Sequence, residues 1–253
     1  MSSIFLFSQS QGRCVELELP QASPSDLEVL HGALPANVSG LSFTRPDLKA
    51  PQQGSVKFHS VSSPRHVAEH LGTLGDRMLN ASQPLAALRF FDLATRMSVD
   101  LVFHLKRAEA LLLLGRLEEA QKETDYVLRY NPENSGVLFL KGRIALHKER
   151  YADAAQFFKR AETFAENDSQ RVTASAYLRF ARIYQDRDQL HLRNLAPNDY
   201  VVEIRQLQSA SCQLRNEVQG STIAPLQGMG VHLEALENLF SNWLRELSTN
   251  IPS

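Results

Sequence analysis

Apolar and small residues return in phase every 34 residues through the middle of the chain. The clearest set is Ala86, Ala120 and Ala154, together with Ala108 and Gly142. A fixed period of this length is typical of a helical solenoid, in which short helical hairpins stack on their neighbours and bury a shared core. The sequence therefore predicts a mainly α-helical fold.

The fullest copy of the pattern runs over residues 101–135. It has a small residue at Ala108, a turn at Gly115-Arg116 and a helix stop at Asn131-Pro132, and residues 136–165 repeat the pattern. These features resemble a tetratricopeptide repeat (TPR). The resemblance implies a TPR-like solenoid in which the first helix of each pair lines a concave surface.

Helix signals extend the array on both sides of these two copies. Ser63-Pro64 reads as a helix start, because serine caps helices and proline tolerates the first helical position. Pro84 opens a partner helix in the same way, and the two form a degraded first repeat. A long helix from Gln170 to about Leu190 closes the array, so we expect a repeat domain over residues 63–190.

The first 62 residues lack the 34-residue pattern and differ from the repeats in composition. Short alternating or apolar stretches at Ile4–Phe7, Cys14–Leu19 and Val56–Val61 read as strands, and proline, glycine and serine clusters separate them. We predict either a small β-containing domain or an extended arm over residues 1–62.

Two later stretches, Tyr200 to Val218 and Leu233 to Leu247, carry apolar residues at alternating steps of four and three. This spacing is close to that of a coiled-coil seam. Residues 219–230 between them contain three glycines and a proline, which break a helix. We expect a C-terminal helical hairpin over residues 191–253.

This hairpin has two possible uses. It packs on the last repeat as a cap, because solenoid ends need a polar outer face. Alternatively it forms a homo-oligomer or partner contact, and Phe240 and Trp243 are the side chains we expect at such a contact.

The TPR resemblance implies the residues of a partner-binding groove. The predicted contacts are Leu105, Glu109, Leu112, Phe139, Arg143 and Tyr177. A mostly apolar groove with Glu109 and Arg143 as polar handles suits an amphipathic helix or an extended peptide. The alternative is that the N-terminal segment or the C-terminal hairpin of the same chain fills the groove, since large apolar patches seldom stay bare.

One enzymatic alternative comes from His66-Val67-Ala68-Glu69-His70, which has the H-x-x-E-H arrangement of inverzincin metalloproteases. On a helix His66 and His70 share a face as two zinc ligands, and Glu69 is placed as a general base. Glu149 is a conceivable third ligand, although it falls in a repeat turn. No other catalytic constellation is present in the sequence.

The composition and charge of the chain exclude several classes of function and location. A net charge of −1 with well-mixed signs gives no electrostatic footprint for nucleic acid. No apolar run approaches the roughly 20 residues of a membrane span. Cys14 and Cys212 have no motif partner, which suits a reducing compartment. We therefore expect a cytoplasmic, non-catalytic adaptor without a cofactor, acting on protein partners as an assembly factor, a chaperone or a subunit of a larger complex.

Overall fold

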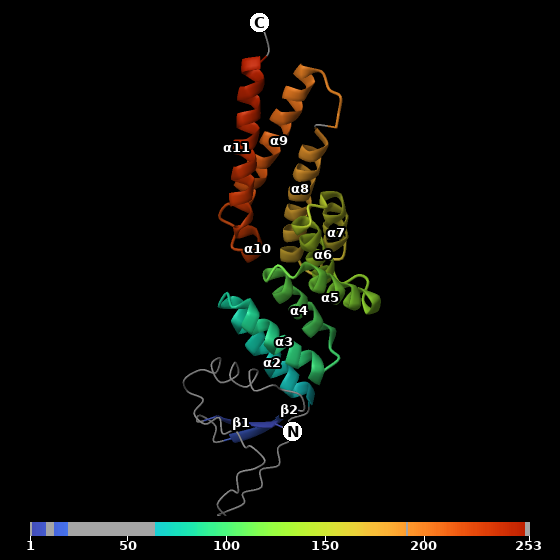
Figure 1. Ribbon diagram of the computed structural model, residues 1–253, viewed down its shortest axis with the longest axis vertical. Helices are drawn as coiled ribbons and strands as arrows, with labels where there is room; N and C mark the ends of the chain where they lie inside the picture. The colour runs from blue at the N-terminus through green and yellow to red at the C-terminus, as the bar shows by residue number, and fades with distance from the viewer. Residues whose placement is uncertain (1, 9–12, 20–63, 191, 251–253) are drawn as a thin grey trace, which may run out of the picture. The chain divides into compact units, whose positions relative to one another are not determined.

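The computed structural model describes residues 2–8, 13–19, 64–190 and 192–250. The chain folds as two compact units, Met1–Arg116 and Leu117–Ser253 (Figure 1). The predicted fold class, helical hairpins with a C-terminal helical hairpin, is confirmed. The division between the units falls in the Gly115-Arg116 turn, and the predicted domain boundaries near residues 62 and 190 stay predictions.

The first unit begins with two antiparallel strands, β1 (Ser2–Ser8) and β2 (Arg13–Leu19). Ile4 pairs with Leu17 and Leu6 with Val15, so the pairing joins the two strands predicted from the sequence. The third predicted strand, Val56–Val61, lies outside the described residues.

In the described part of the first unit the strands are followed by α2 (Pro64–Asn80), α3 (Pro84–Met97) and α4 (Leu101–Leu113). The first two begin at the prolines that predicted them. The Asp100 carboxylate caps α4 by accepting a hydrogen bond from the Val102 backbone N–H at 3.0 Å. Ion pairs from α4 join Lys106 to Asp76 at 3.0 Å and Arg107 to Asp92 at 2.5 Å.

The second unit continues with α5 (Leu117–Tyr130), α6 (Ser135–His147), α7 (Tyr151–Thr163) and α8 (Asp168–Leu190). The fully buried Phe158 ring of α7 lies against the backbone of α6 at Gly142, where even a Cβ atom has no room. The Ser135 hydroxyl donates to the Ala161 carbonyl at 2.9 Å and ties the start of α6 to the end of α7. The small residue at 142 thus allows the close helix approach that the repeat pattern predicts.

The C-terminal hairpin consists of α9 (Pro197–Val218), the single turn α10 (Ala224–Gln227) and α11 (Met229–Asn250) (Figure 1). The long helix α8 shares one apolar cluster with this hairpin. Side chains that are fully or almost fully buried in that cluster include Leu190, Ile204, Leu214, Leu233 and Phe240. The last helix of the array and the hairpin therefore form one packed body.

The turns inside the hairpins repeat a backbone conformation. Ser82, Gly115 and Glu149, spaced 33 and 34 residues apart, have φ of +57°, +73° and +57°. In the second and third of these turns the backbone N–H of the third residue past the helix, Arg116 or Arg150, donates to the carbonyl five residues earlier at 2.9 Å. This is a Schellman-type helix end, whose left-handed residue is normally glycine.

We predict that Gly142→Ala destabilises the protein by about 1–2 kcal/mol, although alanine is the better helix former. The new Cβ would lie 2.5–2.8 Å from three atoms of the Phe158 ring, and that ring is fully buried. Chemical denaturation measures the change. Gly230→Ala, in α11 with nothing within 4 Å of the new Cβ, is the matched control and should be neutral or slightly stabilising. Equal stability of the two variants would mean that the Phe158 ring moves freely.

We predict that Glu149→Gly stabilises the protein by about 0.5–1 kcal/mol, because glycine adopts positive φ without the clash of a Cβ. The Glu149 side chain is exposed, so no packing is lost. Glu149→Ala removes the same carboxylate but keeps the Cβ, and its melting temperature should stay near that of the wild type. A stabilisation of the same size in both variants would assign the effect to the charge.

Candidate functional site

Helix α4 carries three of the six predicted contact residues, Leu105, Glu109 and Leu112. Their spacing of four and three residues places them on one helix face. Leu105 and Glu109 are half-buried, whereas Leu112 is only 3% exposed. Glu109 forms no hydrogen bond or ion pair with any described residue.

Phe139 and Tyr177, from α6 and α8, are brought together with Phe158 in an aromatic cluster. The ring centroids of Phe139 and Tyr177 lie 4.9 Å apart in an edge-on arrangement, and Phe158 lies 5.4 Å from Phe139 and 5.2 Å from Tyr177. Pairs at these distances stabilise a fold beyond the area they bury. Phe139 is half-buried and packs inside the second unit, so a charged substitution there would disturb folding as well as binding.

The C-terminal hairpin contacts Tyr177 directly. The Tyr177 hydroxyl donates a hydrogen bond to the Pro225 carbonyl oxygen at 2.9 Å. Burial raises the pKa of Tyr177, while the nearby Arg143 charge acts in the opposite direction. One predicted contact residue is therefore engaged by the chain itself, in line with the alternative that the hairpin fills part of the groove.

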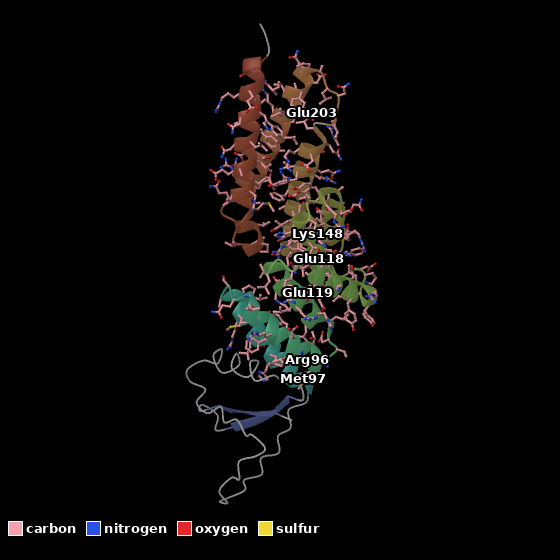
Figure 2. The ribbon with its side chains drawn as sticks, in the orientation of Figure 1. Arg96, Met97, Glu118, Glu119, Lys148 and Glu203 are labelled. Carbon is pink, nitrogen blue, oxygen red and sulfur yellow. The ribbon has the colours of Figure 1, made fainter. Side chains whose placement is uncertain are left out.

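Arg143 differs from the other cations of α6. It is half-buried and forms no ion pair or hydrogen bond with the part of the chain that the structure describes. Lys141 by contrast lies 2.5 Å from an Asp125 oxygen. Figure 2 shows Lys148 beside Glu118, 3.3 Å away. Of the two long cationic side chains of α6, Lys141 therefore has a counter-charge among the described residues and Arg143 has none.

Two histidines accompany Arg143. His147 lies one helical turn further along α6, and its pKa is lowered by burial and then by the charges of Arg143 and His232. His232 belongs to α11, with its ring centroid 6.3 Å from that of Phe180 on α8. Neither histidine is among the contact residues predicted from the sequence. The four-residue step from Arg143 marks His147, but no sequence signal places His232 beside the repeats.

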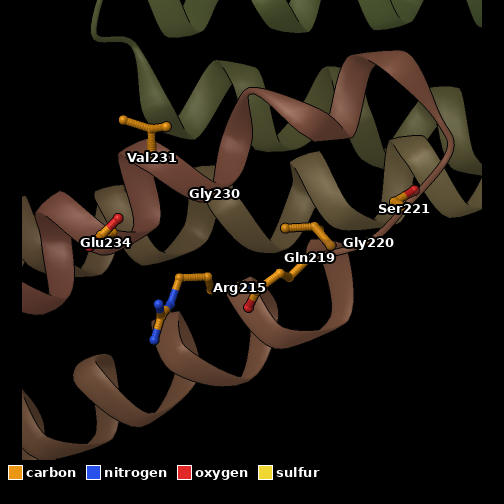
Figure 3. A pocket seen from close by; sticks show the side chains of 8 residues that line it. Arg215, Gln219, Gly220, Ser221, Gly230, Val231 and Glu234 are labelled. Carbon is orange, nitrogen blue, oxygen red and sulfur yellow. The ribbon is translucent and has the colours of Figure 1, made fainter.

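A pocket of about 440 Å³ lies within the hairpin (Figure 3). Arg215 and Val218 of α9 line it on one side, and Val231 and Glu234 of α11 line it on the other. The Arg215 guanidinium already donates to Glu237 at 2.8 Å, which raises the pKa of Arg215. The cationic side chain that lines the pocket is therefore already engaged within the hairpin.

The proposed zinc motif lies on α2. The side chain of His66 lies outside the described residues, and Glu69 accepts a hydrogen bond from the Arg65 Nε at 3.3 Å. Glu149, the conceivable third ligand, is an exposed turn residue of the other unit. Among the side chains that the structure describes, no group of three His, Cys, Asp or Glu residues is arranged to hold a metal ion.

The predicted oligomer contacts have different environments. Phe240 is fully buried in the cluster shared by α8 and the hairpin, so it acts in packing within the chain. Trp243 is half-buried beside it, with the ring centroids 5.8 Å apart. None of the described helices is long and apolar enough to cross a membrane.

Comparison with known proteins supports the repeat assignment. Residues 105–170 match the family model of the tetratricopeptide repeat, which confirms the resemblance for this segment. The chain is also similar to the solved TPR domain of Arabidopsis OM64, with 18% identity over 47% of this chain and 97% of that one and a TM-score of 0.43. A second similar structure is the MamA RS-1 ArsTM double mutant, with 20% identity over 68% of this chain and 94% of that one and a TM-score of 0.42. No curated protein matches the chain.

We predict that Tyr177→Phe loosens the hairpin turn and costs about 0.5–1.5 kcal/mol of stability, because it removes the hydroxyl donor and keeps the aromatic packing. Hydrogen exchange at the amides of residues 221–228 should speed up more than exchange in α3, which belongs to the other unit. Tyr130→Phe is the control, because the exposed Tyr130 side chain of α5 interacts with Tyr126 of the same helix and its loss should not affect the hairpin turn. Equal effects of the two variants would contradict a structural role for the bond to Pro225.

Proposed function

We propose that this protein is a non-catalytic protein-interaction scaffold that binds a peptide or helix of a partner protein through the first helices of its repeats. The observation that carries the proposal is the tetratricopeptide-repeat match over residues 105–170, because repeats of this kind serve as protein-binding scaffolds. The match includes most of α4 and all of α6, the helices that hold five of the six predicted contacts.

The side chains on these helices support the same function. Leu105 offers a half-buried apolar side chain, and Glu109 and Arg143 offer opposite charges that no described residue neutralises. An amphipathic helix is recognised by such a combination of apolar anchors and a few charged groups. Leu112 is buried within α4, Phe139 is half-buried within the second unit, and Tyr177 contributes where the hairpin leaves it accessible.

The proposal also covers the location of the protein, the kind of partner complex and the use of the C-terminal hairpin. The protein acts in the cytoplasm as an adaptor, and its partner complex is one that requires an assembly factor, a chaperone or a small helical subunit. The C-terminal hairpin serves as the cap of the array. A homo-oligomer through Trp243 is the alternative use of the hairpin, and the mass of the protein in solution distinguishes the two.

We predict that Arg143→Glu removes specific partners from an affinity capture with the full chain, because it reverses an α6 charge that no described residue neutralises. Glu109→Lys tests the α4 face in the same way. Both variants should keep the helicity and melting temperature of the wild type. Mass spectrometry of the captured proteins gives the readout.

The charge-matched control for Arg143→Glu is Arg129→Glu, an exposed position on α5, a second helix of a repeat. Its captured proteins should equal those of the wild type. If all three variants retain the same partners, binding does not use the first helices and the proposed function is wrong in its location. Loss of the same partners from all three would indicate non-specific electrostatic capture.

A further inference from the structure

The short helix α10 connects α9 to α11 and also contacts the repeats. Its Pro225 carbonyl oxygen accepts a hydrogen bond from the Tyr177 hydroxyl of α8 at 2.9 Å. The Leu226 side chain is only 3% exposed, whereas Pro225 itself is exposed. Leu226 belongs to the apolar cluster against which Tyr177 of α8 and Leu146 of α6 pack as partly buried side chains. A four-residue segment thus places one buried side chain and one carbonyl group on the repeats.

The long helices of the hairpin are held by contacts that do not involve α10. Between α9 and α11, the Arg215 guanidinium donates to Glu237 at 2.8 Å. Between α8 and α9, the Arg179 guanidinium donates to both carboxylate oxygens of Glu217. Buried leucines of α9 and α11 supply the apolar part of the same packing. Displacement of α10 therefore leaves α9 and α11 in place on α8.

Glycines flank α10 on both sides. Gly220 has a φ of +85°, and an added Cβ at Gly220, Gly228 or Gly230 would meet no atom within 4 Å. Gly220 at one end and Gly230 at the other are among the residues that line the pocket of about 440 Å³ (Figure 3). Glycine changes its backbone conformation at little steric cost, and the pocket gives both ends of the segment room to move. The geometry thus allows α10 to leave α8 while the flanking helices stay packed.

The part of α10 that the repeats contact is short and chemically simple. A single helical turn is not stable by itself in water, so α10 depends on the surface on which it lies. Pro225 stands in the first turn, where its fixed φ suits the start of a helix. The contact unit is therefore a proline that presets a turn, a carbonyl group that accepts from Tyr177, and a leucine that is buried.

We propose that α10 is an internal ligand of the repeats, and that its site on α8 takes a proline-leucine turn of a partner protein when α10 is displaced. This inference rests on the proposed function and specifies both the partner segment and the regulation of the site. Because α10 is tethered, it competes at an effective concentration on the order of millimolar. The apparent affinity for a partner is reduced to the fraction of molecules in which the site is open. A partner therefore needs further contacts on the repeats to displace α10.

The test uses the full-length protein and a fluorine-labelled peptide with the sequence of residues 219–230. Broadening of the fluorine NMR signal measures binding. In the wild type α10 occupies the site, whereas Leu226→Asp removes the buried side chain from α10 and leaves α8 unchanged. We expect the peptide to bind Leu226→Asp about tenfold tighter than the wild type, because the tethered competitor is removed. A peptide that itself carries Leu226→Asp should bind neither protein.

Leu192→Asp is the matched control, because it introduces the same charge at a leucine that is 83% exposed. It should bind the peptide as weakly as the wild type does. Adding Tyr177→Phe to Leu226→Asp should weaken peptide binding about threefold, because the hydroxyl donor is lost. Hydrogen exchange locates the site: the peptide should slow exchange in α8 and leave exchange in α3 of the first unit unchanged.

Equal binding of the peptide to the wild type and to Leu226→Asp would show that α10 does not compete, and would overturn the inference. Absence of binding to Leu226→Asp would overturn it as well. Leu226→Ala repeats the comparison with a smaller loss of packing, and circular dichroism reports whether each variant keeps its helices. Unfolding of both variants would show that α10 is an essential part of the core and not a displaceable ligand.

The proposed scaffold function is judged by a different result. Its test is the set of partners that Arg143→Glu and Glu109→Lys lose in affinity capture, and that experiment does not involve α10. Loss of those partners together with equal peptide binding would leave the scaffold standing and overturn the internal ligand alone.

Discussion

The packing of the second unit depends on the contact between the Phe158 ring and the backbone of Gly142. The absence of a side chain at 142 allows α6 and α7 to approach closely enough to bury the ring completely. Phe158 then contacts Phe139 and Tyr177, and the Tyr177 hydroxyl reaches the hairpin turn at Pro225. One small residue in the repeat pattern thus fixes a chain of contacts that extends to the C-terminal helices.

This arrangement explains why some predicted contact residues are used in packing whereas others remain available for binding. Phe139 and Tyr177 belong to the aromatic cluster, so their side chains serve the fold and only their remaining surface is available for binding. Arg143 lies on the same face of α6 as Phe139 but takes no part in that packing. A repeat scaffold must hold its helices together with apolar residues, and recognition is left to the side chains that packing does not use.

Much of the helical architecture was predictable from the sequence because its signals are local. Pro64 and Pro84 mark helix starts, and the position of Gly142 follows from the 34-residue period. The turn at Glu149 shows the limit of such reasoning, because the period places a turn there but does not reveal that glutamate adopts positive φ. The candidate site was predicted only in part, since the proximity of His232 to α6 depends on how the hairpin packs on α8.

The hairpin therefore has two effects on the same face of the repeats. Through Pro225 it covers Tyr177, and through His232 it adds a basic group near Arg143 and His147. Covering an aromatic side chain removes apolar surface from any partner, whereas an imidazole adds nitrogen atoms that can form hydrogen bonds. Both effects come from one element that shares its apolar cluster with α8, so the packing of the C-terminal hairpin decides which side chains of the repeats stay accessible.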